Sequence, residues 1–326
     1  MLTSSRSPVA GIAVVLTAAS LFGANGPLSR LAYEAGVEPL GFVAWRALVG
    51  LAAALAFVGW RVSRGHRRVV RLRDLDGRAR LSLAIVSVMA FTLNMAMFTS
   101  FSRITVALAL LGFYTYPVMV AVADVLLGHE RLDRPRIVAL VIAVGGMIAV
   151  LIGQLDPAGG IRFDVLGFGF ALGAASSQAV FVVLSRSGYR AVPADQAIAF
   201  VMAVAVVLCS ALAIATGAVS ALTFPIHKPA LLPILVFSGL FAAAIPSILF
   251  LTGIRILGGM RAGILMLFEP VVGVALAGWL LNERLAPIQL AGGLAILSAA
   301  LILQRSASTE ARILSAPAVE AQALGS

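Results

Sequence analysis

The chain has 326 residues, of which 61% are hydrophobic and only 12% are charged, and its mean hydropathy is +1.04. Soluble domains carry about 25% charged residues, so this composition excludes an ordinary soluble protein and indicates an integral membrane protein. The formal charge of +10 has no soluble module to carry it, so we assign it to loops facing anionic lipid and expect no nucleic-acid partner.

Apolar runs long enough to cross a bilayer core of about 30 Å recur along the chain. The first has features of a signal peptide, but it runs longer than the apolar part of one and matches a later segment, so we count it as a crossing. We predict an all-α protein with ten transmembrane helices at 9–32, 39–60, 81–101, 104–127, 136–153, 165–185, 196–217, 231–252, 260–281 and 286–304.

Basic residues predict the orientation, because positive charge in short loops stays in the cytoplasm. Most of the arginines fall on one side if the N-terminus is inside, with the densest group in the loop at residues 61–80. We therefore expect both termini in the cytoplasm, and anionic lipid at this loop, which is either a topology anchor or a lipid-sensing element. The tail at 305–326 is Ala-rich and polar, so we expect it to be disordered.

A phrase is repeated at the ends of two apolar runs, LLGHERL at 126–132 and LLNERL at 280–285. Aligning Glu130 with Glu283 also aligns Pro117 with Pro270, so the chain is a duplication of about 150 residues. We place the first repeat at 9–153 and the second at 165–304. The phrase itself either ends a helix with charge at the membrane interface or takes part in gating.

Each repeat contains five predicted crossings. Because five is odd, the second copy enters the membrane from the opposite side, which makes the repeats inverted. Inverted repeats are a recurring construction of secondary transporters, in which two halves rock around a central site. The pattern therefore favours transport by alternating access.

Five-plus-five helices, a proline in helices four and nine, and the closing GHERL and NERL phrases resemble the EamA-type permeases of the drug/metabolite transporter superfamily. The resemblance covers residues 9–304. It implies a multi-pass carrier of the bacterial inner membrane, typically an exporter of metabolites, amino acids or drugs. It also implies a cavity lined by helices three, four, eight and nine, which favours Asn94, Pro246 and Ser247 as cavity residues.

Two charges lie well inside predicted spans, where insertion costs about 2.5 to 3.5 kcal/mol each. Arg46 lies in helix two and either faces the cavity or extends toward the outer interface. Glu269 lies mid-span in helix nine beside Pro270. It is a candidate counter-charge for a cationic substrate, a proton-accepting site, or a structural partner of Arg46.

Other polar and helix-breaking residues complete the candidate site. Tyr116 aligns with Glu269, and Tyr114 precedes it on the same helix; both rings either contact a ligand or pack. Gln178 either bonds across helices or contacts substrate. We expect Asp124 at the interface. The remaining candidates are the binding residue Asn25 and the hinge residues Gly26, Pro27, Pro117, Pro246 and Pro270.

We expect a secondary transporter that exports a small metabolite, amino acid or drug-like solute, with proton coupling as one option. The sequence contains no phosphate-binding loop, so we expect no ATPase subunit, and no pattern for a metal or another cofactor. We expect a monomer or weak dimer. The alternative is a membrane enzyme, lipid-handling protein or sensor on the same scaffold, with His129, Glu130 and Asp133 as its catalytic candidates.

Overall fold

The computed structural model describes residues 8–65, 69–128, 133–152, 164–281 and 286–315, and within these ranges the chain is helical with no strand. The first half contains α1 (Pro8–Phe22), α2 (Asn25–Glu34), α3 (Pro39–Ser63), α4 (Gly77–Arg103), α5 (Val106–Phe113), α6 (Tyr116–Leu126) and α7 (Arg134–Ile152). The second half contains α8 (Val165–Ser187), α9 (Ala194–Thr216), α10 (Val219–His227), α11 (Leu232–Gly239), α12 (Ile245–Leu257), α13 (Gly259–Met266), α14 (Glu269–Leu281) and α15 (Pro287–Ser315). A π-helical turn at Leu240–Ala244 joins α11 to α12.

Eight segments of the described chain are long and apolar enough to cross a membrane. They are Pro8–Glu34, Pro39–Ser63, Gly77–Arg103, Leu108–Leu126, Arg134–Ile152, Val165–Ser187, Ala194–Thr216 and Pro229–Leu257. The apolar part of α15 is shorter, and α13 with α14 occupies the ninth predicted crossing. An all-α multi-pass membrane protein is thus confirmed, while the count of ten crossings stays a prediction.

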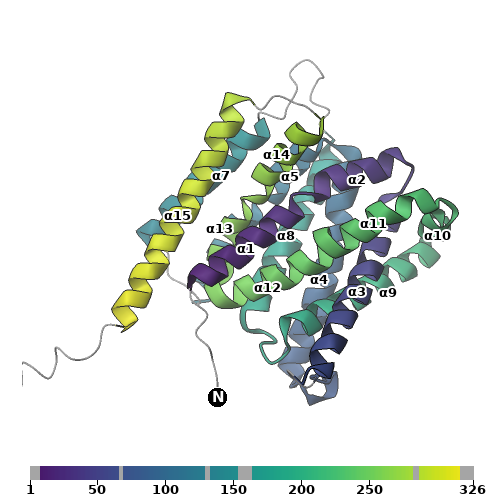
Figure 1. Cartoon of the computed structure of the whole chain (residues 1–326), viewed down its shortest axis with the longest axis horizontal. Helices are drawn as coiled ribbons and strands as arrows, with labels where there is room; N and C mark the ends of the chain where they lie inside the picture. The colour runs from purple at the N-terminus through teal and green to yellow at the C-terminus, as the bar shows by residue number, and fades with distance from the viewer. Residues whose placement is uncertain (1–7, 66–68, 129–132, 153–163, 282–285, 316–326) are drawn as a thin grey trace, which may run out of the picture.

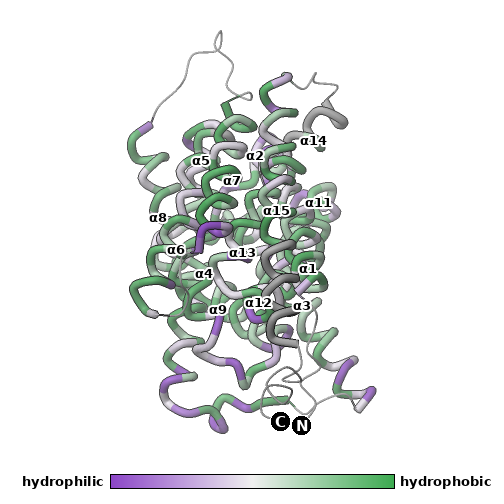
Figure 2. The backbone as a smooth tube through the Cα atoms, turned by 90° about the vertical axis from the view of Figure 1, so that its left-hand side faces the viewer, coloured by the Kyte–Doolittle hydropathy of each residue, from purple (hydrophilic) through white to green (hydrophobic). Residues whose placement is uncertain are grey.

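The exposed surface of the bundle is that of a membrane protein. Large apolar side chains are exposed on many helices, including Val141 on α7 and Leu294 on α15. Figure 2 shows hydrophobic residues through the middle of the bundle and hydrophilic stretches toward its ends. Such an apolar belt is stable only against lipid, because a soluble monomer rarely exposes large apolar patches.

The two repeats have matching helix starts. In the first repeat α5, α6 and α7 start at residues 106, 116 and 134, and in the second α13, α14 and α15 start at 259, 269 and 287, with one constant separation. The repeated phrase itself lies outside the described residues, at 129–132 and 282–285. The duplication is therefore visible in the helix boundaries independently of the phrase that predicted it.

Helix packing follows the same symmetry. The contact of α4 with α8 corresponds to that of α12 with α1, while the pairs α3 with α9 and α7 with α15 each join equivalent helices. Figure 1 shows α7 and α15 side by side along one edge. A Cβ added at Gly146 would lie 2.6 Å from the Gly292 carbonyl oxygen, so only small residues permit this close approach. The chain forms two inverted repeats around a pseudo-two-fold axis.

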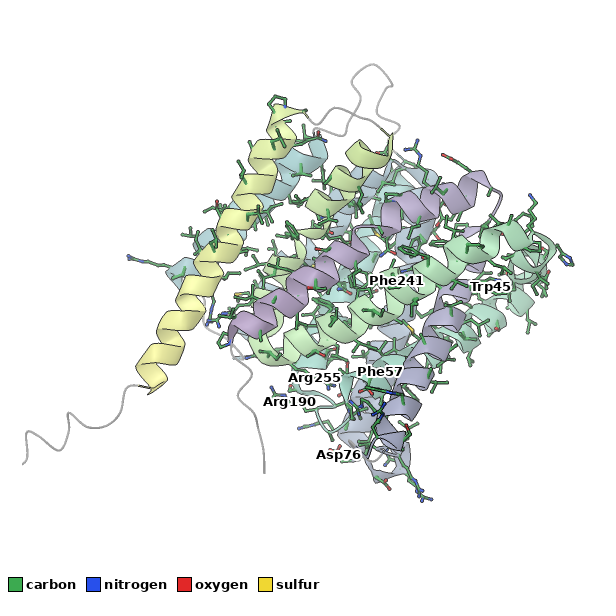
Figure 3. All side chains as sticks on the ribbon, viewed as in Figure 1. Trp45, Phe57, Asp76, Arg190, Phe241 and Arg255 are labelled. Atoms are coloured by element: carbon green, nitrogen blue, oxygen red, sulfur yellow. The ribbon has the colours of Figure 1, made fainter. Side chains whose placement is uncertain are left out.

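Ion pairs join the repeats near the ends of the bundle. Arg103 Nε donates to Asp164 Oδ2 at 2.6 Å, which links α4 to α8 and holds the pKa of the Asp164 carboxyl below its usual range. Arg190 and Arg255 lie with Asp76 at one end of the bundle (Figure 3). That this end is cytoplasmic stays a prediction.

Asp124 and the C-terminal tail show features that the sequence did not predict. Asp124 is fully buried among the helices, and its Oδ1 lies 3.9 Å from Arg186 Nη1. Its carboxylate also lies beside Gly259 at the start of α13, where the partial positive charge of a helix N-terminus favours an anion. Helix α15 continues to Ser315, into the tail that we expected to be disordered from residue 305.

Candidate functional site

A cavity of about 150 Å³ lies among the helices of both repeats. Its size exceeds the space needed for a few water molecules and suits a small organic solute. Seven of the eight predicted binding residues line it, and Tyr114 does not. The seven are Asn25, Arg46, Asn94, Tyr116, Gln178, Ser247 and Glu269.

Arg46 reaches across the cavity wall from α3 to the second repeat. Its side chain is 4% exposed, so it does not extend toward the interface. Nη2 donates to the carbonyl oxygen of Ala242 at 2.7 Å. In a regular α-helix this oxygen would accept from the N–H of residue 246, but residue 246 is a proline and has no N–H. Arg46 therefore supplies the donor that Pro246 removes, at the π-helical turn.

Two amide side chains of the first repeat also hold the guanidinium. Nη2 donates to Asn25 Oδ1 at 2.9 Å, and Nη1 donates to Asn94 Oδ1 at 3.4 Å. The guanidinium carbon lies 4.6 Å from the centroid of the Phe98 ring, within cation–π range. Nε is buried and has no hydrogen-bond partner, so one of the donors of this group is not used by the protein.

Glu269 lies at a helix break on another wall. It is the first residue of α14, after the two residues that separate α14 from α13. Pro270 follows it, which suits the first turn of a helix and prevents α13 from continuing. Gly23, at the break between α1 and α2, packs there, since a Cβ added to it would lie 3.0 Å from the Glu269 carbonyl oxygen. Two broken helices therefore meet at the backbone of Glu269.

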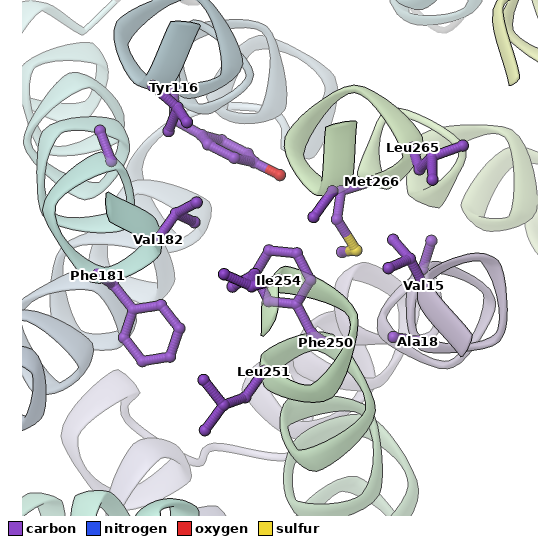
Figure 4. Packing of buried hydrophobic residues seen from close by; sticks show 14 of the residues in the cluster. Val15, Ala18, Tyr116, Phe181, Val182, Phe250, Leu251, Ile254, Leu265 and Met266 are labelled. Carbon is purple, nitrogen blue, oxygen red and sulfur yellow. The ribbon is translucent and has the colours of Figure 1, made fainter. Parts of the chain in front are cut away.

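Two tyrosines approach Glu269 from the matching break of the first repeat. Tyr114 and Tyr116 are almost completely buried, and both interact electrostatically with Glu269. Neither hydroxyl reaches hydrogen-bond geometry with a protein partner. Gln178 on α8 lies close to the Tyr116 hydroxyl. Figure 4 shows this hydroxyl directed into the space beside Met266. The Tyr116 phenol lines the cavity, so it is the one of the two that a bound solute can contact.

Arg46 and Glu269 lie within electrostatic range of each other, but they form no ion pair among the residues that the structure describes. Neither charge neutralises the other by direct contact. Buried charges are usually paired, so the cavity keeps a cationic side at Arg46 and an acidic side at Glu269. This arrangement suits a solute that brings complementary groups to one or both sides.

The rest of the wall is apolar and aromatic, which the sequence analysis missed. Phenylalanine is common in the chain, and position in the sequence alone does not separate a lining ring from a packing ring. Figure 4 shows Phe181 and Phe250 on facing helices beside the cavity. The lining phenylalanines are Phe22, Phe98, Phe101, Phe113, Phe181 and Phe250.

The predicted hinge residues lie at helix starts. Pro117 is the second residue of α6 and Pro270 the second of α14, each directly after a break. Pro246 is the second residue of α12, next to the π-helical turn. Gly26 and Pro27 lie in the first turn of α2. Prolines at these places end the preceding hydrogen-bond ladder, so the segments that surround the cavity can bend.

The groups of the enzyme alternative do not form a described cluster. His129 and Glu130 lie outside the described residues. Asp133 accepts from the backbone N–H of Arg136 at 3.2 Å and pairs with its Nε at 3.3 Å, as a residue that caps α7 does. In the described part of the chain no group of three His, Cys, Asp or Glu could hold a metal ion.

Comparison with known proteins places these features in context. The family model described as EamA-like transporter family matches residues 9–152 and 165–305. A solved structure titled "Crystal structure of protein" has a TM-score of 0.72 and 20% identity, covering 93% of this chain and 97% of that one. That likeness shows a shared fold. No curated protein matches the chain.

Proposed function

Because the chain belongs to the EamA-like transporter family, we propose that it is a secondary transporter of a small organic solute that binds in the cavity between the two repeats. Transport proceeds by alternating access, in which the inverted repeats open the cavity to one side of the membrane and then to the other. We propose that the protein lies in the bacterial inner membrane and that it exports its solute from the cytoplasm.

The observation that carries this proposal is the lining of the cavity. Seven predicted polar residues from both repeats meet in one space whose remaining wall is aromatic and apolar. Sites for small molecules have this composition, with a few placed polar groups in an apolar pocket. The solute is therefore a metabolite, amino acid or drug-like compound that carries an apolar body and at least one charged group.

Glu269 either recognises a charged group of the solute or couples transport to proton exchange. Both Tyr114 and Tyr116 interact with its carboxylate, and Tyr116 also lines the cavity, so an ammonium group of the solute would meet one acidic and one phenolic partner there. The alternative role is proton exchange, since an isolated carboxylate in a cavity can take up a proton when the solute leaves. An acceptor group of the solute would be placed at Arg46, whose Nε lacks a partner.

The test is uptake or efflux in proteoliposomes, after a thermal-shift screen with amino acids, amines and drugs has selected a stabilising solute. We expect Glu269→Gln to abolish flux while membrane abundance stays normal. Glu34→Gln is the matched control, because the Glu34 side chain is 64% exposed and pairs with Arg30 at the surface. Undiminished flux in Glu269→Gln would remove Glu269 from the mechanism, and no flux for any stabilising solute would contradict transport itself.

Flux measured with and without an imposed pH gradient separates the two roles of Glu269. If the carboxylate exchanges protons, the gradient drives flux in the wild type and has no effect on any residual flux in Glu269→Gln. If the carboxylate only recognises charge, the gradient has no effect in the wild type, and a solute without its cationic group loses its affinity for the wild type.

A further inference from the structure

A second cavity lies away from the first, beneath the arginine-rich loop after α3. Its volume is about 320 Å³, at the lower end of the roughly 300 to 1,000 Å³ of small-molecule sites. Its walls are almost wholly apolar. Two long helices contribute Leu51, Leu55, Val58, Ala199, Phe200 and Ala203. We call this cavity the α3–α9 groove.

The loop that covers the groove is fixed to α9. The backbone N–H of Val70 donates to Gln196 Oε1 at 3.1 Å, and Gln196 Nε2 donates back to the Val70 carbonyl. Arg61 Nη1 lies 3.1 Å from Asp195 Oδ1, which joins the end of α3 to the start of α9. Val70 and Leu72 of the loop turn their side chains to the groove. The loop over the groove is therefore held in place by hydrogen bonds and an ion pair.

The side of the groove is open. Leu55 is 55% exposed although it lines the groove, and Phe57 on the same helix is 43% exposed. Phe57 stacks on Trp60 at 5.8 Å between ring centroids. In Figure 3 Phe57 is labelled on the part of α3 that leads toward Asp76 and the loop. Exposed Trp beside a basic loop is typical of the membrane–water interface, so the opening faces lipid.

Positive charge is in excess around the opening. Arg71 and Arg73 flank Leu72 and are exposed, and Arg64 lies over the Trp60 ring. The acidic groups nearby are already engaged. Asp74 lies 3.9 Å from Arg73, Asp76 caps α4, and Asp195 pairs with Arg61.

We propose that the α3–α9 groove binds an anionic phospholipid, with one acyl chain against the apolar walls and the phosphate among Arg64, Arg71 and Arg73. The apolar walls recognise the chain and the arginines recognise the headgroup. A neutral lipid with the same chains would fill the groove without meeting the charge. A free phosphate would meet the charge and leave the groove empty.

The experiment is native mass spectrometry on the delipidated full chain in detergent. The probes are phosphatidylglycerol, phosphatidylcholine with the same acyl chains, and inorganic phosphate. One variant, Ala203→Phe, fills the groove, and a second, Arg71→Ala with Arg73→Ala, removes charge. Arg30→Ala is the control, because Arg30 is an exposed arginine on α2, far from the loop in sequence.

We expect phosphatidylglycerol to bind more tightly than phosphatidylcholine. Each arginine near a headgroup contributes roughly 5-fold in affinity, so the double variant should lose roughly 25-fold. Ala203→Phe should weaken both lipids, and Arg30→Ala should change neither. If a variant does not fold, phosphatidylglycerol binding to the wild type should still fall as salt is raised.

Three results would overturn the proposal. Equal affinity for the two lipids would mean that the arginines do not recognise the headgroup. Binding that is unchanged in Ala203→Phe would place the lipid elsewhere on the protein. Displacement of phosphatidylglycerol by inorganic phosphate at similar concentration would identify an anion site instead of a lipid site.

Discussion

Arg46 holds together parts of the chain that lie far apart in sequence. Its guanidinium donates to Asn25, to Asn94 and to the Ala242 carbonyl, and so it joins three helical segments of two repeats. A lysine would bring the same charge, but its single ammonium group does not have the planar fork that serves several acceptors at once. The side chain thus acts both as a cavity charge and as a structural bridge.

Replacing Arg46 with methionine keeps much of the apolar volume and leaves those acceptors unsatisfied. A buried acceptor without a donor costs about 1 to 3 kcal/mol, so we expect a clear fall in thermal stability. Arg46→Lys should lose less, since an ammonium group can still serve one acceptor. Thermal unfolding of the purified proteins measures this. A methionine variant as stable as the wild type would show that these hydrogen bonds do not contribute to stability.

Broken helices form the cavity at the scale of elements. The break between α5 and α6 and that between α13 and α14 are equivalent in the two repeats, and each precedes a proline. The breaks place Tyr116 and Glu269 at helix starts, where the chain turns toward the cavity. The π-helical turn before Pro246 places the carbonyl of Ala242 within reach of Arg46. Departures from regular helix are tolerated in a membrane where they line a cavity.

The link between Pro246 and Arg46 can be tested by a double-mutant cycle. Pro246→Ala restores the backbone N–H at position 246, which can then donate to the Ala242 carbonyl. Arg46→Met should therefore cost less stability in this background than in the wild type, with a coupling of about 1 kcal/mol. Pro225→Ala, inside α10, is the control background, where the two changes should add. Additivity in both backgrounds would refute the link.

The inverted relation of the repeats sets the properties of the whole molecule. Equivalent helices pair across the pseudo-two-fold axis, so the cavity lies between the halves. The arginine-rich loop, Arg190 and Arg255 lie at one end of the bundle, which the distribution of positive charge predicts to be cytoplasmic. The end that carries Lys228 should then face the other side.

Cysteine labelling tests this orientation. The native Cys209 is buried, and Cys209→Ala provides a background without cysteine. We expect a membrane-impermeant maleimide to label Lys228→Cys on intact cells, and to label Ser63→Cys only after the cells are permeabilised. Both positions are exposed in the folded chain. The reverse pattern would place the termini and the arginine-rich loop outside the cell.

The sequence by itself determined the membrane class, the duplication and the candidate residues. Apolar length follows from bilayer thickness, and the repeat follows from aligned residues such as Pro117 and Pro270, so both are local properties that a sequence carries. Arg46 and Glu269 could be identified from the sequence for a similar reason. A charged residue inside a span costs free energy however the helices pack, so its position alone marks it as a candidate.

Only the tertiary structure decided which groups meet. It brought Arg46 to the carbonyl of Ala242, whose regular helical donor Pro246 removes, and it placed the Glu269 carboxylate beside two phenols without an ion pair to Arg46. The packing of the helices also buries Asp124 and determines which phenylalanines line the cavity. These outcomes depend on helix rotation and on contacts between residues up to two hundred positions apart, as for Arg46 and Ala242. The apolar pattern of a segment determines that its helix lies in the membrane. Packing against neighbouring helices determines which way its side chains face.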